Sequence, residues 1–179
     1  MRVFLIAGKG NSGKNTTAEI IKDYYAKKNI ETVITSISKY IKMYATEISN
    51  WDGIDEDKPR ALLQMIGSKV REEMGDKFFV RRLVEDLSFY KLNYENIVVS
   101  DVRLPFEIEY FQEVLGDMVY TIRVTRDDYV SNLKEEEKNH ETEVALDTYN
   151  RFDYEITNSD LVSLKKEVEK VLERIDGNE

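Results

Sequence analysis

The 179-residue chain contains no cysteine, a single histidine and only two prolines. The absence of cysteine excludes disulfide bonds and thiolate metal sites, and it suits a reducing cytoplasm. One histidine without cysteine partners does not make a metal site, so we interpret His140 as structural. Few prolines and no low-complexity tract give no sign of a linker, and the length fits one domain. We therefore expect a single domain that spans residues 1–179.

The chain also lacks an excess of positive charge. Lys and Arg number 26 against 35 Asp and Glu, which gives a net charge of −9. Nucleic-acid polymers and anionic membranes both require a basic face or segment, so neither is an expected partner. The first apolar run is too short for a signal peptide or a transmembrane helix. We expect a cytoplasmic monomer or homodimer that concentrates its cations locally if it binds small anions.

The first seventeen residues carry the most informative pattern. Residues 2–7 are apolar and predict a strand, residues 8–17 read GKGNSGKNTT, and an amphipathic stretch runs from residue 18 to about 28. This spacing of glycines and lysine is typical of a phosphate-binding P-loop. Its amides would form an anion nest at the positive end of the following helix, and Lys14 would reach the β- and γ-phosphates. The predicted nucleotide-binding residues are Gly8, Gly10, Asn11, Ser12, Gly13, Lys14, Asn15, Thr16 and Thr17.

One position of the P-loop departs from the usual pattern. Residue 15 is Asn, where Ser or Thr ordinarily supplies a hydroxyl to Mg²⁺. An amide is a poorer magnesium ligand than a hydroxyl, which leaves the metal role open for Thr16.

Two further predicted strands end in polar residues. Residues 32–37 are β-branched, and Lys39 follows them at the end where ligands of open α/β sheets bind; a solvated lysine is an equal alternative. Residues 97–103 form a continuous apolar run that ends near Asp101 and Arg103, which is typical of a buried parallel strand. An acid at this place in P-loop proteins holds Mg²⁺ or aligns the acceptor, and Arg103 would pair with a phosphate. The alternative is that Asp101 caps the next helix.

Residues 60–74 predict a helix with cationic residues on one side. Arg60, Gln64 and Arg71 are four and seven positions apart, so they share a face. Arginine is suited to bidentate recognition of a phosphate. An ordinary charged helix face is the alternative, and spacing alone favours it.

The remaining chain completes the predicted architecture. Helices are expected over residues 76–92 and 104–115, strands over 118–125 and 152–157, and a closing helix from about 158. Residues 127–138 are highly charged and lie where a mobile lid would cover a nucleotide, although a charge run is usually a solvated face. The order predicts a five-stranded parallel α/β sandwich, with a lid at approximately 127–145.

The chain resembles the P-loop deoxynucleoside monophosphate kinases of the phage type, and also the animal-type phosphomevalonate kinases. The matching segments are residues 8–17, PR at 59–60 with LLQ at 62–64 and Gly67, VSDVR at 99–103, EIEYF at 107–111, HETE at 140–143 with LD at 146–147, and FDY at 152–154 with ITN at 156–158. The resemblance implies a three-layer α/β/α P-loop kinase with a five-stranded parallel sheet and a helical lid. It further implies an ATP-dependent enzyme that uses Mg²⁺ and phosphorylates a small phosphomonoester. This chain departs from both families at residue 15, where they typically carry Asp after the lysine and this chain has Asn15.

The resemblance also implies roles for individual residues. Arg60, Arg71 and Arg103 would hold the acceptor phosphate, with Gln64 and Lys39 nearby. Arg126 and the lid would cover the reacting phosphoryl group, and Asn158 would lie near the adenine. Lys14, Asp101, Arg103 and Arg126 would act in catalysis, and Thr16 with Asp101 would hold the metal. Glu143 matches a position that orders Arg or Lys side chains.

Several functions stay open at this point. The acceptor would be a nucleoside monophosphate, or alternatively of the phosphomevalonate or dephospho-coenzyme A type. Trp51 and the aromatic-rich helices would stack on a base or belong to the core. A nucleotide-binding or regulatory module without transfer is the alternative that Asn15 favours.

Overall fold

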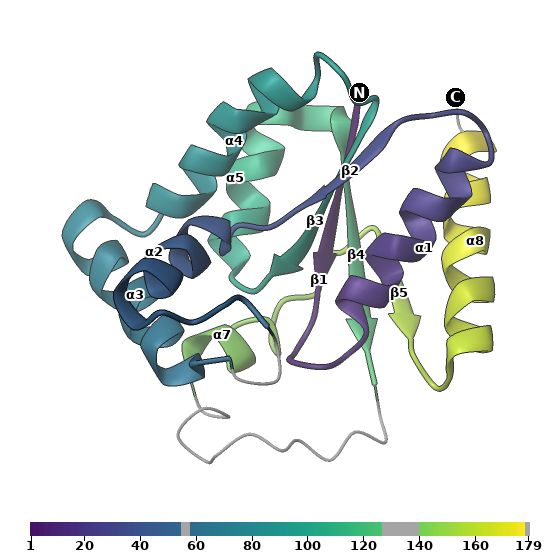
Figure 1. Cartoon of the computed structure of the whole chain (residues 1–179). Helices are drawn as coiled ribbons and strands as arrows, with labels where there is room; N and C mark the ends of the chain where they lie inside the picture. Colours follow the sequence, from purple (N-terminus) through teal and green to yellow (C-terminus); the bar gives the residue numbers. More distant parts are fainter. Residues whose placement is uncertain (55–57, 127–139, 178–179) are drawn as a thin grey trace.

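The computed structural model describes residues 1–54, 58–126 and 140–177 (Figure 1). Within these residues strands and helices alternate for most of the chain, as the sequence predicts. The elements are β1 (Arg2–Ala7), α1 (Lys14–Ala26), β2 (Thr32–Thr35), α2 (Lys39–Ser49), α3 (Arg60–Met74), α4 (Phe78–Tyr90), β3 (Asn96–Val102), α5 (Pro105–Leu115), the 3₁₀ turn η1 (Gly116–Met118), β4 (Val119–Thr125), α7 (Glu141–Val144), β5 (Tyr154–Thr157) and α8 (Leu161–Gly177).

The described strands form one five-stranded sheet in the order β2-β3-β1-β4-β5. Every neighbouring pair is parallel, so all the strands end at the same edge. The central strand β1 is buried from Val3 to Ala7, because a parallel sheet is covered on both faces. The predicted parallel α/β sheet is therefore confirmed.

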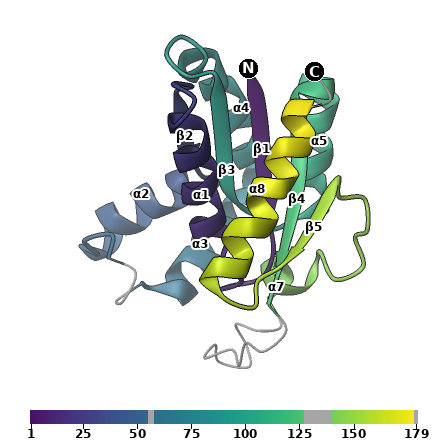
Figure 2. The same cartoon turned by 90° about the vertical axis from the view of Figure 1, so that its right-hand side faces the viewer.

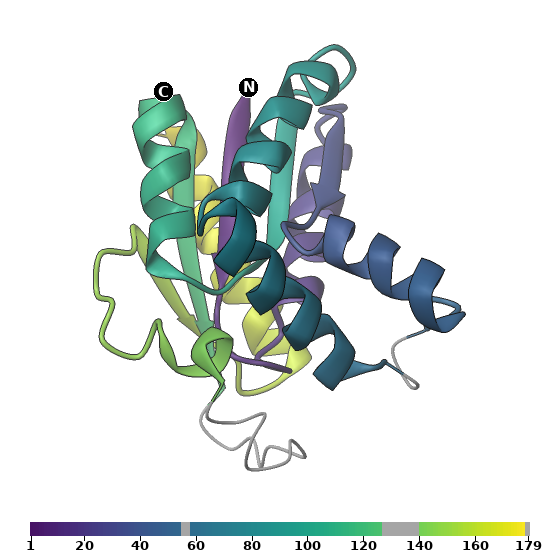
Figure 3. The same cartoon turned by 90° about the vertical axis from the view of Figure 1, so that its left-hand side faces the viewer.

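Helices cover both faces of the sheet. Helices α1 and α8 lie on one face and helices α4 and α5 on the other (Figures 2 and 3). Side chains of β1 alternate between the two resulting cores: Phe4 and Ile6 pack toward α1 and α8, whereas Leu5 packs toward α4 and α5. This confirms the three-layer arrangement.

Helices α2 and α3 form a separate pair beside the edge where the strands end (Figure 1). They pack on each other through a small cluster that includes Ala45, Trp51 and Ile66. Trp51 is only 7% exposed in this cluster, so it belongs to the core and does not stack on a ligand. The chain termini lie at the opposite end of the sheet, away from the loop that joins β1 to α1.

The predicted lid falls mostly outside the described residues. Only its last part, from His140 onward, is described, and it contains the short helix α7. His140 begins this helix, because its Nδ1 accepts a hydrogen bond from the amide of Thr142 at 3.3 Å. The structural interpretation of His140 fits this cap. None of the described helices combines the length and apolar character that crossing a membrane would require.

Candidate active site

The loop between β1 and α1 has two glycines that no other residue would replace without strain. Gly8 has φ 147°, and a Cβ built on it would lie 2.3 Å from the carbonyl oxygen of Val124 in β4. Gly13 has φ 107°, and its Cβ would lie 2.5 Å from Nδ2 of Asn158. Both backbone conformations favour glycine. The loop is thus pressed against the ends of β4 and β5 and enters α1 directly at Lys14.

Lys14 is folded back onto its own loop. Its Nζ donates hydrogen bonds to the carbonyl oxygens of Gly8 at 2.8 Å and Lys9 at 2.6 Å. Burial, with a contribution from the nearby Arg103 guanidinium, lowers the pKa of Lys14 to about 7, and Glu143 partly opposes this shift. A buried ammonium group that repels a neighbouring cation is stabilised when an anion binds beside it.

The lowered pKa predicts that nucleotide binding takes up a proton. A bound phosphate raises the pKa of Lys14, so the complex holds more protons than the free protein above about pH 7. Affinity for a non-hydrolysable ATP analogue should therefore fall as pH rises from about 7 toward the usual lysine range. Calorimetry at about pH 8 in buffers of different ionisation enthalpy should report roughly 0.9 proton per analogue. Uptake that persists unchanged in Lys14→Met would assign the proton to another group.

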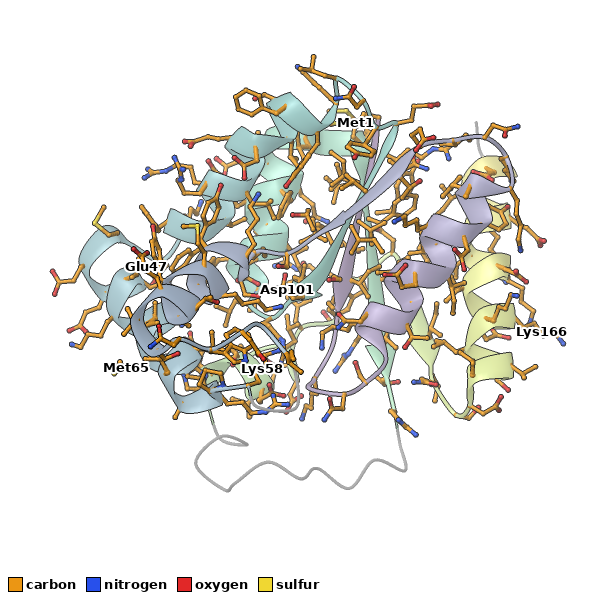
Figure 4. The ribbon with its side chains drawn as sticks, viewed as in Figure 1. Met1, Glu47, Lys58, Met65, Asp101 and Lys166 are labelled. Carbon is orange, nitrogen blue, oxygen red and sulfur yellow. The ribbon has the colours of Figure 1, made fainter. Side chains whose placement is uncertain are left out.

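One cavity of about 650 Å³ joins the loop to the α2–α3 pair. On one side it is lined by loop residues, and on the other by cationic side chains from several elements. Figure 4 shows Asp101 and Lys58 on this side of the molecule, whereas Lys166 lies on the outer side of α8. The predicted site residues that line the cavity are Gly10, Asn11, Gly13, Lys14, Asn15, Thr16, Arg60, Gln64, Arg71, Asp101, Arg103, Arg126 and Asn158.

Four of the predicted site residues do not line the cavity. Gly8, Ser12 and Thr17 do not line the cavity, because each is turned into the protein behind the loop. Thr17 is fully buried, and its hydroxyl has no hydrogen-bond partner among the described residues. These three residues shape the loop and do not face a ligand from this position.

Lys39 is the fourth, and it lies outside the cavity, so its predicted place beside the substrate has no support here. Its Nζ forms an ion pair with Asp86 of α4 and donates to the Tyr90 hydroxyl at 3.0 Å. Lys39, the first residue of α2, is held against α4 by this ion pair, whereas Lys42 lines the cavity. Lys42 and Lys58 are cavity cations that the sequence analysis missed, since no motif marks an isolated lysine.

Asp101 has a structural task beside any role with a ligand. Its Oδ1 accepts from the amide of Ile37 at 2.7 Å, and its Oδ2 accepts from the amide and hydroxyl of Ser38. The carboxylate thus holds the two residues that precede α2. The alternative supposed that Asp101 caps the next helix along the chain, which is α5, and these bonds are made to the start of α2 instead. Asp101 also lines the cavity, at the end of β3.

Glu107 is a second carboxylate that lines the cavity, and the sequence analysis gave it no role in the site. Its Oε2 accepts from the amides of Arg103 at 2.8 Å and Leu104 at 3.0 Å, which fixes the start of α5. Burial raises its pKa to about 7. A glutamate in the first turn after a proline is a recognisable helix-start signal, and it would have found this residue.

Asn158 holds the loop between β1 and α1 in place. Its Nδ2 donates to the carbonyl oxygen of Ser12 at 2.9 Å, and its side chain closes over Gly13. The side chain also lines the cavity. Its expected place near the adenine stays a prediction.

Glu143 of α7 reaches both halves of the cavity. Its Oε2 accepts from the amide of Gly10 at 2.8 Å, and its Oε1 forms an ion pair with Nη1 of Arg103. The same guanidinium donates to the carbonyl oxygen of Thr142 at 3.4 Å. Arg71 lies 3.7 Å from the Glu141 carboxylate, so α7 faces the predicted acceptor arginines.

The residues present fit a magnesium ion only together with phosphates. Thr16 and Asp101 offer a hydroxyl and a carboxylate, which are oxygen ligands that Mg²⁺ prefers. In the part of the chain that the structure describes, no group of three or more His, Cys, Asp or Glu residues is arranged to hold a metal. A magnesium ion here would take its remaining ligands from nucleotide phosphates and water.

Comparison with curated proteins gives relatives without an assigned activity. No family model matches the chain. The chain is 32% identical over 124 residues to a UPF0200 protein of Saccharolobus islandicus (strain L.S.2.15 / Lassen #1), and equally to one of Saccharolobus solfataricus. Each alignment covers 69% of this chain and 57% of the relative, so the chain spans little more than half the length of these relatives.

Solved structures with the same fold are P-loop kinases. A gluconokinase from Sinorhizobium meliloti 1021 aligns over 99% of this chain and 94% of its own, with a TM-score of 0.51 and 14% identity. A shikimate kinase from Bacteroides thetaiotaomicron aligns over 98% of both chains, with a TM-score of 0.50 and 13% identity. Identities this low bear on fold alone, so the resemblance to nucleoside monophosphate and phosphomevalonate kinases stays a prediction. The chain has the three-layer α/β/α fold of the P-loop kinases.

Proposed function

We propose that the protein is an ATP-dependent small-molecule kinase that transfers the γ-phosphoryl group to a phosphomonoester. The observation that carries this proposal is one continuous cavity that joins the P-loop to a cluster of cationic side chains. That cluster contains Arg60, Arg71 and Arg103 together with Lys42 and Lys58. In an acidic protein, cations gathered opposite a phosphate loop are suited to a second anion.

The proposed mechanism depends on positioning and charge neutralisation, as phosphoryl transfer generally does. The amides of residues 10–14 and the ammonium group of Lys14 would hold the β- and γ-phosphates. Arg103 and Arg71 would hold the acceptor phosphate, while Asp101 keeps the start of α2 in place through its bonds to Ile37 and Ser38. Magnesium, when bound with the nucleotide near Thr16 and Asp101, would neutralise charge on the transferring group. Arg126 lines the same cavity and would cover that group.

A nucleoside monophosphate is the acceptor class that we favour. Apolar side chains of α2, α3 and α4 line the cavity beside polar groups, which suits a planar base with hydrogen-bonding edges. The apolar residues are Ile41, Leu63, Phe79 and Val80, and the neighbouring polar residues are Gln64 and Asp76. Phosphomevalonate-type and dephospho-coenzyme A-type acceptors are alternatives within the same reaction class.

A nucleotide-binding module without transfer is the second candidate. Asn15 favours it, because this residue lines the cavity where a metal-binding hydroxyl is usual. Thr16 is adjacent and exposed, so it would have to replace that hydroxyl.

A panel of acceptors separates the two candidates. The chain is incubated with ATP and Mg²⁺ and with nucleoside monophosphates, phosphomevalonate or dephospho-coenzyme A in turn, and ADP and phosphorylated product are both quantified. The kinase proposal predicts ADP formation that depends on one acceptor and equals the product formed. Binding of a non-hydrolysable ATP analogue without product from any acceptor would favour the module.

A further inference from the structure

One carboxylate spans the two proposed ligand sites. The side chain of Glu143 is only 10% exposed, although it comes from the one-turn helix α7. Its two oxygens are used separately: Oε2 receives the amide of Gly10 at 2.8 Å, and Oε1 receives the guanidinium of Arg103. A Cβ built on Gly10 would lie 3.4 Å from Oε2, so the carboxylate rests directly on the loop.

The position of this carboxylate is one that an anionic ligand requires. The amide of Gly10 belongs to the loop whose N–H groups would bind phosphate, and an N–H has one hydrogen to donate. Arg103 is likewise the guanidinium expected to bind the acceptor phosphate. A carboxylate and a phosphate present similar charged oxygens to such donors. The two carboxylate oxygens of Glu143 therefore occupy one hydrogen-bond donor of each proposed site: the Gly10 amide and the Arg103 guanidinium.

We propose that Glu143 couples the two sites: nucleotide phosphates displace its carboxylate from Gly10, and this displacement releases Arg103 to bind the acceptor phosphate. The inference rests on the proposed function, since it takes the loop as the nucleotide site and Arg103 as an acceptor group. Glu143 is thus a positioning residue that acts through Arg103.

Electrostatics explains why one event would cause the other. A triphosphate in the loop takes over the Gly10 amide and repels the carboxylate at short range. Once Glu143 moves, Arg103 loses its charged partner but keeps its hydrogen bond to the carbonyl oxygen of Thr142. A guanidinium held by one neutral carbonyl has donors left for a phosphate. Because coupling between binding sites is reciprocal, the acceptor phosphate would strengthen nucleotide binding equally.

The test measures ligand binding and needs no turnover. Glu143→Gln keeps the size of the side chain and an oxygen that accepts from Gly10, but it removes the charge. A non-hydrolysable ATP analogue with Mg²⁺ should bind this variant about tenfold more tightly than the unaltered protein, within the usual range of coupling between sites. The matched control is Asp147→Asn, which removes a carboxylate from the same segment. Asp147 forms an exposed ion pair with Lys9 at 2.8 Å, and such pairs contribute little.

A second measurement distinguishes coupling from static support of Arg103. Inorganic phosphate is titrated into each protein after its loop has been filled with the analogue. If the nucleotide has already released Arg103 from Glu143, phosphate affinity should differ by less than about threefold between Glu143→Gln and the unaltered protein. If Glu143 instead supports Arg103 permanently, the variant should lose most of its phosphate affinity, and that result would overturn the proposal. Analogue binding that is unchanged or weaker in Glu143→Gln would overturn it as well. Absence of analogue binding in every variant would instead remove the proposed nucleotide site itself.

Discussion

Replacing Lys14 by methionine should reduce phosphoryl transfer about a thousandfold and leave the fold unchanged, judged from the cost of removing one charge contact in a transition state. Methionine retains the apolar stem, which matters because Lys14 is only 6% exposed. The variant loses the ammonium group that would hold the β- and γ-phosphates. The fold should persist, because the ammonium group now bonds only to carbonyl oxygens of its own loop.

The measurement is initial-rate kinetics with the best acceptor, paired with thermal unfolding. Lys22→Met is the matched control, since Lys22 lies on the same helix and is exposed. This control should retain the activity of the unaltered protein. Near-normal turnover in Lys14→Met would refute the proposed mechanism, whereas loss of the folded state would direct the test to Lys14→Arg, which keeps the charge but misplaces it.

Replacing Arg103 by methionine should lower kcat/KM for the acceptor by about a hundredfold or more, while affinity for the ATP analogue changes only a few-fold. The guanidinium is expected to bind the acceptor phosphate, so its loss affects the second substrate first. Arg103→Lys should recover part of the loss, because lysine restores the charge without the planar fork. Both variants are compared through the KM of the acceptor, kcat and analogue binding.

Arg82→Met provides the control for removing an arginine. Arg82 lies on α4 outside the cavity, where it pairs with Glu85 at 3.4 Å. Its replacement should leave both KM values unchanged. If Arg103→Met lost analogue binding and acceptor binding to the same degree, Arg103 would belong to the nucleotide half, and the assignment of the acceptor site would be wrong.

Much of the fold was accessible from local sequence patterns. The apolar run at residues 2–7 became β1, and the amphipathic pattern at residues 60–74 became α3. The helix expected over residues 104–115 became α5, and Gly116 at its end has φ 55°. These features depend on residues close in sequence, because backbone conformation, apolar periodicity and helix ends are local properties.

The site was accessible only in part. The P-loop has a fixed spacing, and Asp101 with Arg103 follows a recognisable buried strand, so both were predicted to meet at the edge of the sheet. The direction in which the Lys39 side chain points could not be predicted from the sequence, because an ion pair with Asp86 on another helix decides it. Glu107 carried a local signal that went unused.

The sequence alone determined the parallel α/β architecture and the glycine-rich loop between β1 and α1, since both follow from neighbouring residues. Only the tertiary structure decided that Glu143 contacts Gly10, 133 positions away, and Arg103, 40 positions away. It also decided that Lys14 is buried and that its pKa falls to about 7. The physical reason is that burial and electrostatic contacts depend on distances in space, and these exist only after β1, β3 and α7 have been brought to one edge of the sheet.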